Sequence, residues 1–483
     1  MSLTFLRWLG FAGSLMLAVA GWLGGALPGA DLATDPVKVA RSDFGPVVLG
    51  FWLLGTAAQA WAWWSGRDRV PTLRWAAGTA LLWLLPFLFV PPMGSRDVYS
   101  YACQGEMFVH GVDPYLHGIN ALPCTWVQMV SEIWRDSVTP YGPLFLIIAG
   151  AAVKLGGSLT GIIVVFRLVT FASILAVAAC LPALARRCGI EPGRAIWVAL
   201  AGPLVGAHLL AAPHNDAVMI GLLVAGLFLI VRADARPLPL LAGGLLLGLA
   251  VAVKATAVVV VPFAVLIAAR PAARAASRLA ACLRALPRPA LLVGGASLAA
   301  LAGVTVAGGL GFGWIPAMRG SASVIQFTSP PTAVGMTLTY AGQLVHPGFD
   351  AVPAVRALAL VTLCIVLIVL LVRTLSAEDR ERTALRGAAL TMAAVVLLSP
   401  VFHPWYVFWP LTLLAATTLR TNAFMLVSIV AAFSVLPDGG GLPRFVKFPG
   451  APLMTILIVV LVVRFVRRRT TPAQPDAQQR AVP

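Results

Sequence analysis

Charged residues are scarce in this chain of 483 residues, and so are the motifs of soluble nucleotide chemistry. Only 11% of the residues are Asp, Glu, Lys or Arg, whereas soluble globular domains carry about 25%. The sequence has no Walker-type phosphate loop and no glycine-rich dinucleotide fingerprint. It also lacks the C-x-x-C spacing of a zinc or redox site. These absences argue against an ordinary soluble domain, and we expect neither a bound metal nor an organic cofactor.

Long apolar runs take the place of charge. Hydrophobic residues make up 59% of the chain, and the runs 76–91, 161–185 and 451–463 carry no charge except Arg167. Runs of about 17–25 apolar residues are typical of transmembrane helices, because the bilayer core is about 30 Å thick. A helix also pairs its own backbone polar groups, as lipid requires. The sequence therefore predicts an all-α polytopic membrane protein.

The formal net charge is +17, from 35 basic and 18 acidic residues. In a soluble chain this excess would suggest nucleic acid, but no nucleic-acid-binding signature accompanies it, and we predict no such partner. Basic residues of membrane proteins gather in cytoplasmic loops. With a cytoplasmic N-terminus, helices over about 5–27, 44–64 and 75–91 place residues 93–140 outside the cell, as an outer loop of the plasma membrane.

The segment 141–155 decides the rest of the topology. If it crossed the membrane, Arg186, Arg187 and Arg194 would lie outside, against the charge rule. We therefore expect it to lie at the outer face, or to enter it only partly, with 161–185 as the fourth helix. The later basic clusters then fall inside, which gives about 14 spans and two cytoplasmic termini. The polar tail 470–483 is predicted to be disordered.

The outer loop 93–140 carries most of the candidate chemistry. Asp97 follows a membrane helix directly, where partial loss of water would raise the pKa of a carboxyl towards that of a general base. The alternative is an interfacial helix cap or an ion pair with Arg96. Cys103 and Cys124 share this loop and could form a disulfide in an oxidising compartment.

Turn-rich segments follow in the same loop, at 111–115 and 139–144. Between them, Trp126, Val130 and Trp134 recur at helical spacing. The pattern predicts a helix over 126–137 that lies along the membrane surface. We interpret this helix as scaffold.

Two further motifs lie near the outer face. In the run Pro213-His-Asn-Asp216, His214, Asn215 and Asp216 could bind sugar hydroxyls or support the base, or Asn215 and Asp216 could cap the following helix. Lys254 lies between two apolar runs, where an ionisable residue is a functional candidate. It could hold a lipid phosphate, or it could reach the interface by snorkelling.

The last candidates are Arg319, in a second outer loop over 312–352, and His403, in the run Phe402-His-Pro-Trp-Tyr406. Arg319 is a second phosphate-binding candidate. Trp405 and Tyr406 are typical of interfacial aromatic belts. His403 is predicted to shape a sugar or phosphate site.

These motifs, in this order, carry a resemblance to a known family. The run 95–105, the Asp-Pro-Tyr of 113–115, the Pro-Tyr-Gly-Pro-Leu of 140–144, and the two runs at 213–216 and 402–406 resemble those of GT-C glycosyltransferases. They look most like the actinobacterial polyprenol-phosphomannose-dependent α-1,6-mannosyltransferases of lipomannan assembly. The resemblance covers roughly residues 93–409 and implies a GT-C membrane domain over 1–469.

The resemblance also implies roles for residues. Asp97 would be the base on the acceptor hydroxyl, and Lys254 would contact the donor phosphate. Arg96, Tyr101, Asp113 and Tyr115 stand in the matching motifs and are expected to bind substrate.

The implied reaction moves mannose from polyprenyl-phosphate mannose to a glycolipid or mannoside acceptor, with inversion and without a metal. Another lipid-phosphate-sugar transferase, such as an arabinosyl or protein mannosyl enzyme, is the enzymatic alternative. A transporter or flippase is the alternative of a different class. Transporters tend to show internal repeats and polar residues near the midplane, whereas here we find no convincing repeat and the polar residues collect at one face.

Overall fold

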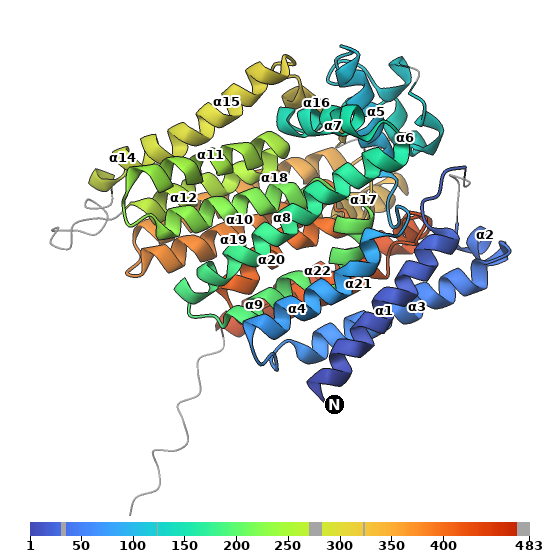
Figure 1. The fold of residues 1–483 in the computed structure, drawn as a ribbon, viewed down its shortest axis with the longest axis horizontal. Helices are drawn as coiled ribbons and strands as arrows, with labels where there is room; N and C mark the ends of the chain where they lie inside the picture. The colour runs from blue at the N-terminus through green and yellow to red at the C-terminus, as the bar shows by residue number, and fades with distance from the viewer. Residues whose placement is uncertain (30–34, 123, 270–282, 322–323, 471–483) are drawn as a thin grey trace, which may run out of the picture.

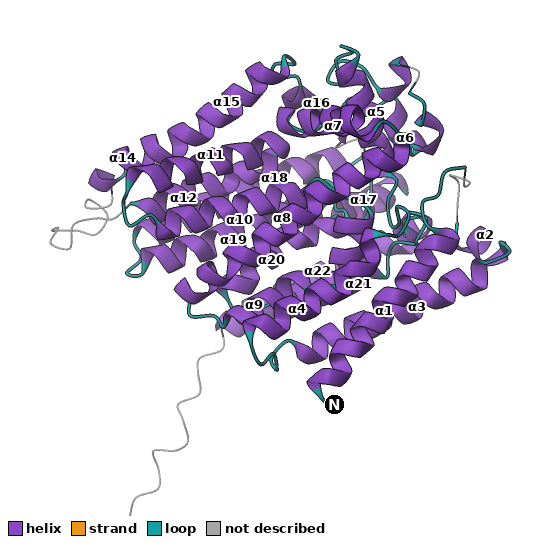
Figure 2. Ribbon diagram, viewed as in Figure 1, coloured by secondary structure: helices purple, strands orange, loops and turns teal. Residues whose placement is uncertain are grey.

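The computed structural model describes residues 1–29, 35–122, 124–269, 283–321 and 324–470. This part of the chain is helical and contains no β-strand beyond an isolated bridge between Val435 and Gly441 (Figure 2). The predicted disordered tail lies outside the described residues from position 471 onward.

The first half of the chain folds into helices that run back and forth through one bundle (Figure 1). In chain order they are α1 (Leu3–Gly24), α2 (Pro36–Arg41), α3 (Gly45–Gly66), α4 (Leu73–Leu84), the 3-10 helix η1 (Leu85–Leu88), α5 (Asp97–Val109), η2 (Ile119–Ala121), η3 (Val127–Met129), α6 (Glu132–Arg135), α7 (Pro143–Gly156), α8 (Leu159–Arg187), α9 (Pro192–Leu200), the π-helix η4 (Val205–Ala211) and α10 (Asp216–Arg232).

The second half adds helices that pack on the first. They are α11 (Pro237–Val253), η5 (Ala255–Val260), α12 (Val261–Ala268), α14 (Pro287–Pro289), the π-helix η6 (Ala290–Gly295), α15 (Ala296–Gly308), α16 (Trp314–Ser321), α17 (Pro330–Gln343), α18 (Val352–Leu375), α19 (Arg380–Leu398), η7 (Pro404–Val407), α20 (Phe408–Thr417), α21 (Asn422–Ala432), η8 (Leu442–Val446) and α22 (Lys447–Thr470).

Several helices are long and apolar enough to cross a membrane. In the described residues five segments meet this test by length and composition, and they are Leu3–Gly24, Leu159–Arg187, Leu283–Gly308, Val352–Leu375 and Leu442–Arg464. The pair α9 and η4, bent by 67°, would be a sixth. The chain is therefore a polytopic membrane protein. The expected span count of about 14 is not reached by this test, because helices such as α11 and α12 are shorter.

Two features of the N-terminal region agree with the sequence analysis. The helices α1 and α3 begin and end within three residues of the predicted bounds. The helix α7 has 14 residues, which is about 21 Å at 1.5 Å per residue and too short for a bilayer core of about 30 Å. Pro143 starts it, and Gly157 ends it with a φ of 61°.

The helix predicted over 126–137 is wrong. The chain forms only η3 and α6 there, with extended backbone at Val130. The Arg135 guanidinium bonds back to the carbonyls of Val130 (3.1 Å) and Gln128 (3.1 Å). These carbonyls therefore have a side-chain partner where a continuous helix would supply backbone N–H groups.

Arg167, on α8, pairs with backbone carbonyls at two places where helices of the bundle are interrupted. Its guanidinium donates to the carbonyl of Leu88 (3.2 Å), at the end of η1, and to the carbonyl of Ala211 (2.9 Å), at the end of η4. Carbonyls freed at a break in a helix need such partners, because lipid offers none. The buried arginine therefore stabilises the turn that leads into residues 213–216.

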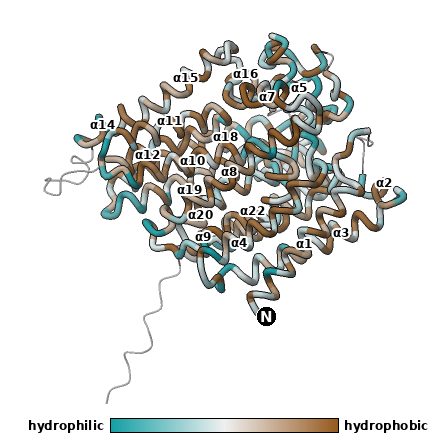
Figure 3. Tube along the Cα trace, in the orientation of Figure 1, coloured by the Kyte–Doolittle hydropathy of each residue, from teal (hydrophilic) through white to brown (hydrophobic). Residues whose placement is uncertain are grey.

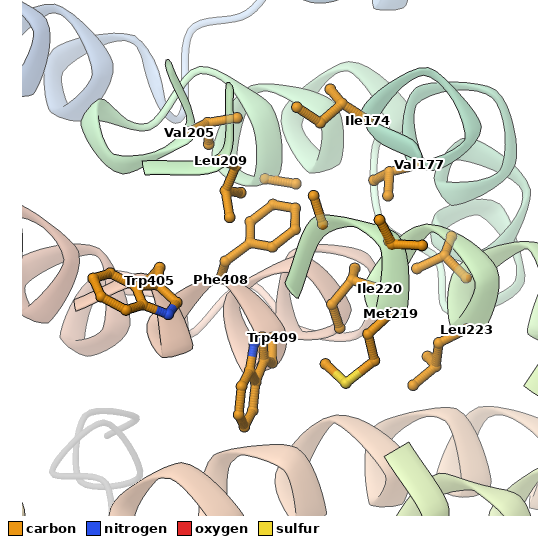
Figure 4. Packing of buried hydrophobic residues seen from close by; sticks show 14 of the residues in the cluster. Ile174, Val177, Val205, Leu209, Met219, Ile220, Leu223, Trp405, Phe408 and Trp409 are labelled. Atoms are coloured by element: carbon orange, nitrogen blue, oxygen red, sulfur yellow. The ribbon is translucent and has the colours of Figure 1, made fainter. Parts of the chain in front are cut away.

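The core is a continuous apolar cluster. Side chains of α8, η4, α10 and α20 interdigitate around Leu209, Ile220 and Phe408 (Figure 4). Apolar residues also dominate along the helices of the bundle, whereas polar residues concentrate in the connecting loops (Figure 3). The helices α5, α6, α7 and α16 gather at one end of the bundle (Figure 1).

Candidate active site

A cavity of about 210 Å³ lies where the outer-loop helices meet the bundle. Its wall includes Asp97, Tyr101, Asp216, Lys254 and His403, which the sequence analysis drew from four separate motifs. The fold therefore brings five of the eleven predicted site residues to one cavity.

The Asp97 carboxylate enters the cavity because the chain turns sharply just before α5. Gly94 adopts a φ of 75°, and its N–H donates to the carbonyl of Pro437 (2.7 Å). The Ser95 hydroxyl then accepts from the N–H of Asp97 (3.1 Å). Asp97 is the first residue of α5, where the positive end of the helix dipole favours a carboxylate.

His214 is the partner of this carboxylate. The Nε2 atom of His214 lies 3.5 Å from the Oδ2 atom of Asp97, and the Nδ1 atom contacts the carbonyl of His208. Burial by itself raises the pKa of the Asp97 carboxyl, but His214, together with His403 and Ser95, lowers that pKa below its ordinary value. The expectation of a raised pKa is therefore wrong, because it considered the burial of Asp97 without the effect of these neighbours.

A second carboxylate, Asp216, pairs with Lys254. The Lys254 ammonium donates to Oδ1 of Asp216 at 2.8 Å, and the indole N–H of Trp409 donates to the same oxygen at 2.7 Å. Asp216 is fully buried, while its Oδ2 atom has no hydrogen-bond partner in the described residues. The alternative that side chains of this motif cap α10 is wrong, because Asn215 stands at the N-cap position and its side chain makes no capping hydrogen bond.

Lys254 stands at a break between α11 and η5, with extended backbone. Its ammonium lies 4.5 Å from the ring centre of Tyr406 and 4.9 Å from that of Trp409. Aromatic faces attract cations, so the side chain is held inside the cavity wall. The snorkelling alternative is wrong, because the Lys254 side chain is only 12% exposed.

Trp405 is the centre of a stack of imidazoles. The ring of His214 lies 3.8 Å from it and the ring of His403 lies 4.8 Å from it, both nearly parallel. Burial lowers the pKa of His403 to about 4, so that this imidazole is neutral at pH 7. Trp405 is 7% exposed and Tyr406 lines the cavity, which contradicts their interpretation as an interfacial belt.

The other predicted residues do not line the cavity. Asp113 accepts from the N–H of Tyr115 (2.8 Å), and the Tyr115 hydroxyl donates to the carbonyl of Tyr141 (3.0 Å), so both shape the loop. Arg96 is buried at the N-cap of α5, and Asn215 is fully buried. Arg319 lies on α16, but its side chain is outside the described part of the structure. Substrate contacts for these residues stay predictions.

Several aromatic residues of the cavity wall were not predicted from the sequence. Tyr141, Trp134 and Trp409 line the cavity, together with Gln104 and the Ser399–Pro400 turn. Trp409 could have been suspected from its place four residues after Trp405, which puts both on one side of a helical turn. Gln104 had a similar signal, because it lies seven residues after Asp97 on the same helix.

The disulfide considered for the outer loop is present. Cys103, on α5, is bonded to Cys124, with a Cα–Cα distance of 5.5 Å. The bond ties the loop 110–124 to the helix that carries Asp97. Among the described residues no three His, Cys, Asp or Glu side chains form a metal-binding group, and the absence of a metal requirement stays a prediction.

Two family models match the chain. Residues 7–270 match the family model described as "Alpha-(1->6)-mannopyranosyltransferase, N-terminal domain", and residues 331–464 match the one described as "MptB C-terminal domain". No solved structure matches the chain significantly.

Individual relatives cover most of the chain. It is 30% identical to alpha-(1->6)-mannopyranosyltransferase A of Mycobacterium tuberculosis, over 89% of this chain and 84% of the relative. It is also 30% identical to a probable alpha-(1->6)-mannopyranosyltransferase of Mycolicibacterium smegmatis, over 98% and 91% of the two chains. With the Corynebacterium glutamicum alpha-(1->6)-mannopyranosyltransferase A it shares 31% identity over 67% of each chain. The chain therefore belongs to the alpha-(1->6)-mannopyranosyltransferase family.

Proposed function

We propose that this chain transfers mannose from polyprenyl-phosphate mannose to a lipid-linked mannoside, with inversion at the anomeric carbon and formation of an α-1,6 linkage. The observation that carries the proposal is a single cavity lined by both an ionised carboxylate, Asp97, and a cation, Lys254. Sugar transfer from a lipid phosphate needs a base for the acceptor and positive charge for the leaving phosphate. The names of the relatives support the choice of sugar and linkage.

Asp97 acts on the acceptor. Its carboxylate takes the proton of the attacking hydroxyl while the oxygen forms a bond to the anomeric carbon of mannose. The bond between that carbon and the phosphate oxygen breaks, and polyprenyl phosphate leaves with the bonding electrons. A β-linked donor gives an α product, because attack comes from the face opposite the leaving group.

Lys254 acts on the leaving phosphate. An ammonium group has three N–H donors, and Asp216 accepts one of them. The remaining donors are available to a phosphate oxygen. Asp216 also fixes the position of the ammonium, so the enzyme does not have to order a flexible side chain during the reaction.

The aromatic wall suits a sugar ring. Trp405, Tyr406 and Trp409 offer flat apolar surfaces next to the polar groups of Asp216 and His403. Such pockets, apolar with a few placed polar groups, are typical of small-molecule sites.

The proposed setting is the outer face of the plasma membrane. With the N-terminus inside, basic residues such as Arg187 and Arg386 fall on the cytoplasmic side, and the cavity falls outside. In this proposal shorter apolar helices other than α7, such as the 17-residue α11, add to the spans of a GT-C-like arrangement of about 14. The polyprenyl chain would lie in the bilayer between helices.

The experiment is mannosyl transfer by purified protein in defined liposomes, with polyprenyl-phosphate mannose and a synthetic mannoside acceptor. We expect wild-type protein to form α-1,6 product, and Asp97→Asn to lose activity by at least about 100-fold, in the range typical of general bases. Glu132→Gln, which removes an exposed carboxylate of the same loop outside the cavity, is the matched control.

Three outcomes would contradict the proposal. Wild-type-like turnover by Asp97→Asn would remove the base assignment. A donor with another sugar used in preference to mannose would point to a different transferase. Movement of labelled lipid without product would favour a flippase.

A further inference from the structure

A second hollow lies at the other end of the bundle. It has a volume of about 380 Å³, and three arginines from two separate segments line it. Arg382 and Arg386 come from α19, and Arg420 follows α20; the remaining wall is Gly189, Ile190 and Thr417–Leu419. None of these residues takes part in the cavity described above.

The helix α19 connects the two sites. Arg382 and Arg386 lie in its first two turns, while Ser399, directly after its end, lines the active-site cavity. Its 19 residues span about 28 Å at 1.5 Å per residue, close to the thickness of a bilayer core of about 30 Å. The hollow and the active-site cavity therefore lie about one bilayer thickness apart, at opposite ends of α19.

The three arginines of the hollow have exposed side chains. Among the described residues, the guanidinium groups of Arg382, Arg386 and Arg420 form no hydrogen bond or ion pair. Two nearby carboxylates are already engaged, since Glu381 lies 3.5 Å from Arg187 and Asp379 accepts from the backbone N–H of Arg382. Arg382 and Arg386 are one helical turn apart and share a face of α19. The hollow thus gathers three basic side chains that have no ion pair of their own in the described part of the chain.

The third arginine is presented by a firmly held loop. The buried side chain of Arg194 donates to the carbonyl of Leu419 (3.0 Å) and contacts the hydroxyl of Thr421 (3.2 Å), on either side of Arg420. The Leu419 side chain, in the same wall, is 63% exposed. A charged group and an exposed apolar group side by side suit a ligand with both a charged head and an apolar tail.

We infer that this hollow binds a phosphate group. Guanidinium groups match phosphate oxygens in charge and in paired donor geometry. The phosphate could belong to the headgroup of an anionic lipid or could be free in solution, and the exposed Leu419 beside the arginines favours the lipid. This inference is independent of the proposed sugar transfer.

The test is native mass spectrometry of the full chain in detergent, titrated with phosphatidylglycerol or with phosphatidylcholine of the same acyl chains. We expect wild-type protein to bind phosphatidylglycerol in preference. The variant Arg382→Gln/Arg386→Gln/Arg420→Gln should bind it about tenfold more weakly, as expected for the loss of charge-assisted bonds worth about 1.4 kcal/mol.

The matched control is Arg232→Gln/Arg373→Gln/Arg464→Gln, which removes the same charge outside the hollow. It should bind phosphatidylglycerol as wild type does. If it loses as much affinity as the hollow variant, or if the two lipids bind wild type equally, the inference is overturned. Should the triple variant fail to fold, Arg420→Gln by itself replaces it and should still weaken binding.

Competition with inorganic phosphate distinguishes a lipid headgroup from free phosphate as the ligand. If millimolar phosphate leaves bound phosphatidylglycerol in place, the site takes a lipid headgroup. Displacement of the lipid from wild type at that concentration identifies free phosphate as the ligand, and the phosphate chemistry of the site stands.

Discussion

The imidazole of His214 lies between a backbone carbonyl and the Asp97 carboxylate: its Nδ1 atom contacts the carbonyl of His208, and its Nε2 atom lies 3.5 Å from Oδ2 of Asp97. His214 thus faces the carboxylate that is to act as the base. Burial raises the pKa of this carboxylate, but His214, His403 and Ser95 together lower it below its ordinary value.

Replacing His214 should move the acid limb of activity to higher pH. Asp97 works as a base only when ionised, so activity is present above its pKa and lost as pH falls through it. In His214→Phe the lowering partner is gone while burial still raises the pKa. Loss of a charged hydrogen bond of about 1.5–3 kcal/mol corresponds to about one to two pH units. The measurement is kcat/KM against pH.

The control for this shift is His117→Phe, which changes an exposed histidine of the outer loop. Its acid limb should coincide with that of wild type. An unchanged acid limb in His214→Phe would show that His214 does not act through the pKa of Asp97.

Variants of the ion pair between Lys254 and Asp216 should affect stability and catalysis differently. Lys254→Met leaves a buried carboxylate without its cation, which should lower the free energy of unfolding by about 3–5 kcal/mol. The double variant Lys254→Met/Asp216→Asn removes both charges and should recover much of that stability. It should not recover mannosyl transfer, because the leaving phosphate still lacks its cation.

Thermal unfolding in detergent and transfer activity are the two measurements for this pair. Full activity in the stable double variant would show that Lys254 takes no part in the reaction and has only a structural role.

Reduction of the outer-loop disulfide should destabilise the protein. Cys103 and Cys124 are 21 residues apart, and closing a loop of this size constrains the unfolded chain by about 3 kcal/mol. Cys103→Ser/Cys124→Ser should therefore unfold at a lower temperature than wild type, with Cys180→Ser as the control. Two free thiols at these positions in non-reduced wild-type protein would contradict the bond.

Arg356 should act as a positioning residue for the cavity. From α18 its guanidinium donates to the carbonyls of Pro400 (3.1 Å) and Val324 (2.8 Å), and Pro400 lines the cavity. Arg356→Met should lower kcat by about 10- to 100-fold, the scale of a small misplacement of catalytic groups. Arg373→Met, exposed on the same helix, should leave kcat unchanged; equal kcat in both variants would exclude this role.

The sequence by itself determined the class of the protein and the region of its chemistry. Uncharged runs of transmembrane length require a polytopic helical protein, because lipid cannot pair backbone polar groups. Placement of Arg186 and Arg194 on the inner side predicted that residues 141–155 would not cross the membrane; the segment forms the 14-residue helix α7, and its place relative to the bilayer stays a prediction. Lys254 could be selected because an ionisable residue is costly in such a chain and so marks a functional position. Asp97, His214 and His403 were selected by their motifs, and the role of Asp97 as the base rested largely on the resemblance that these motifs carry.

Only the tertiary structure decided which of these residues meet. Asp216 lies 38 residues from Lys254 and 193 from Trp409, and no local pattern links positions so far apart. Whether the pKa of Asp97 is raised or lowered also depended on a contact that is distant in sequence. Burial raises this pKa, and partners such as His214 lower it. The helix expected at 126–137 failed because the Arg135 side chain binds carbonyls of its own segment, a contact that apolar periodicity does not register.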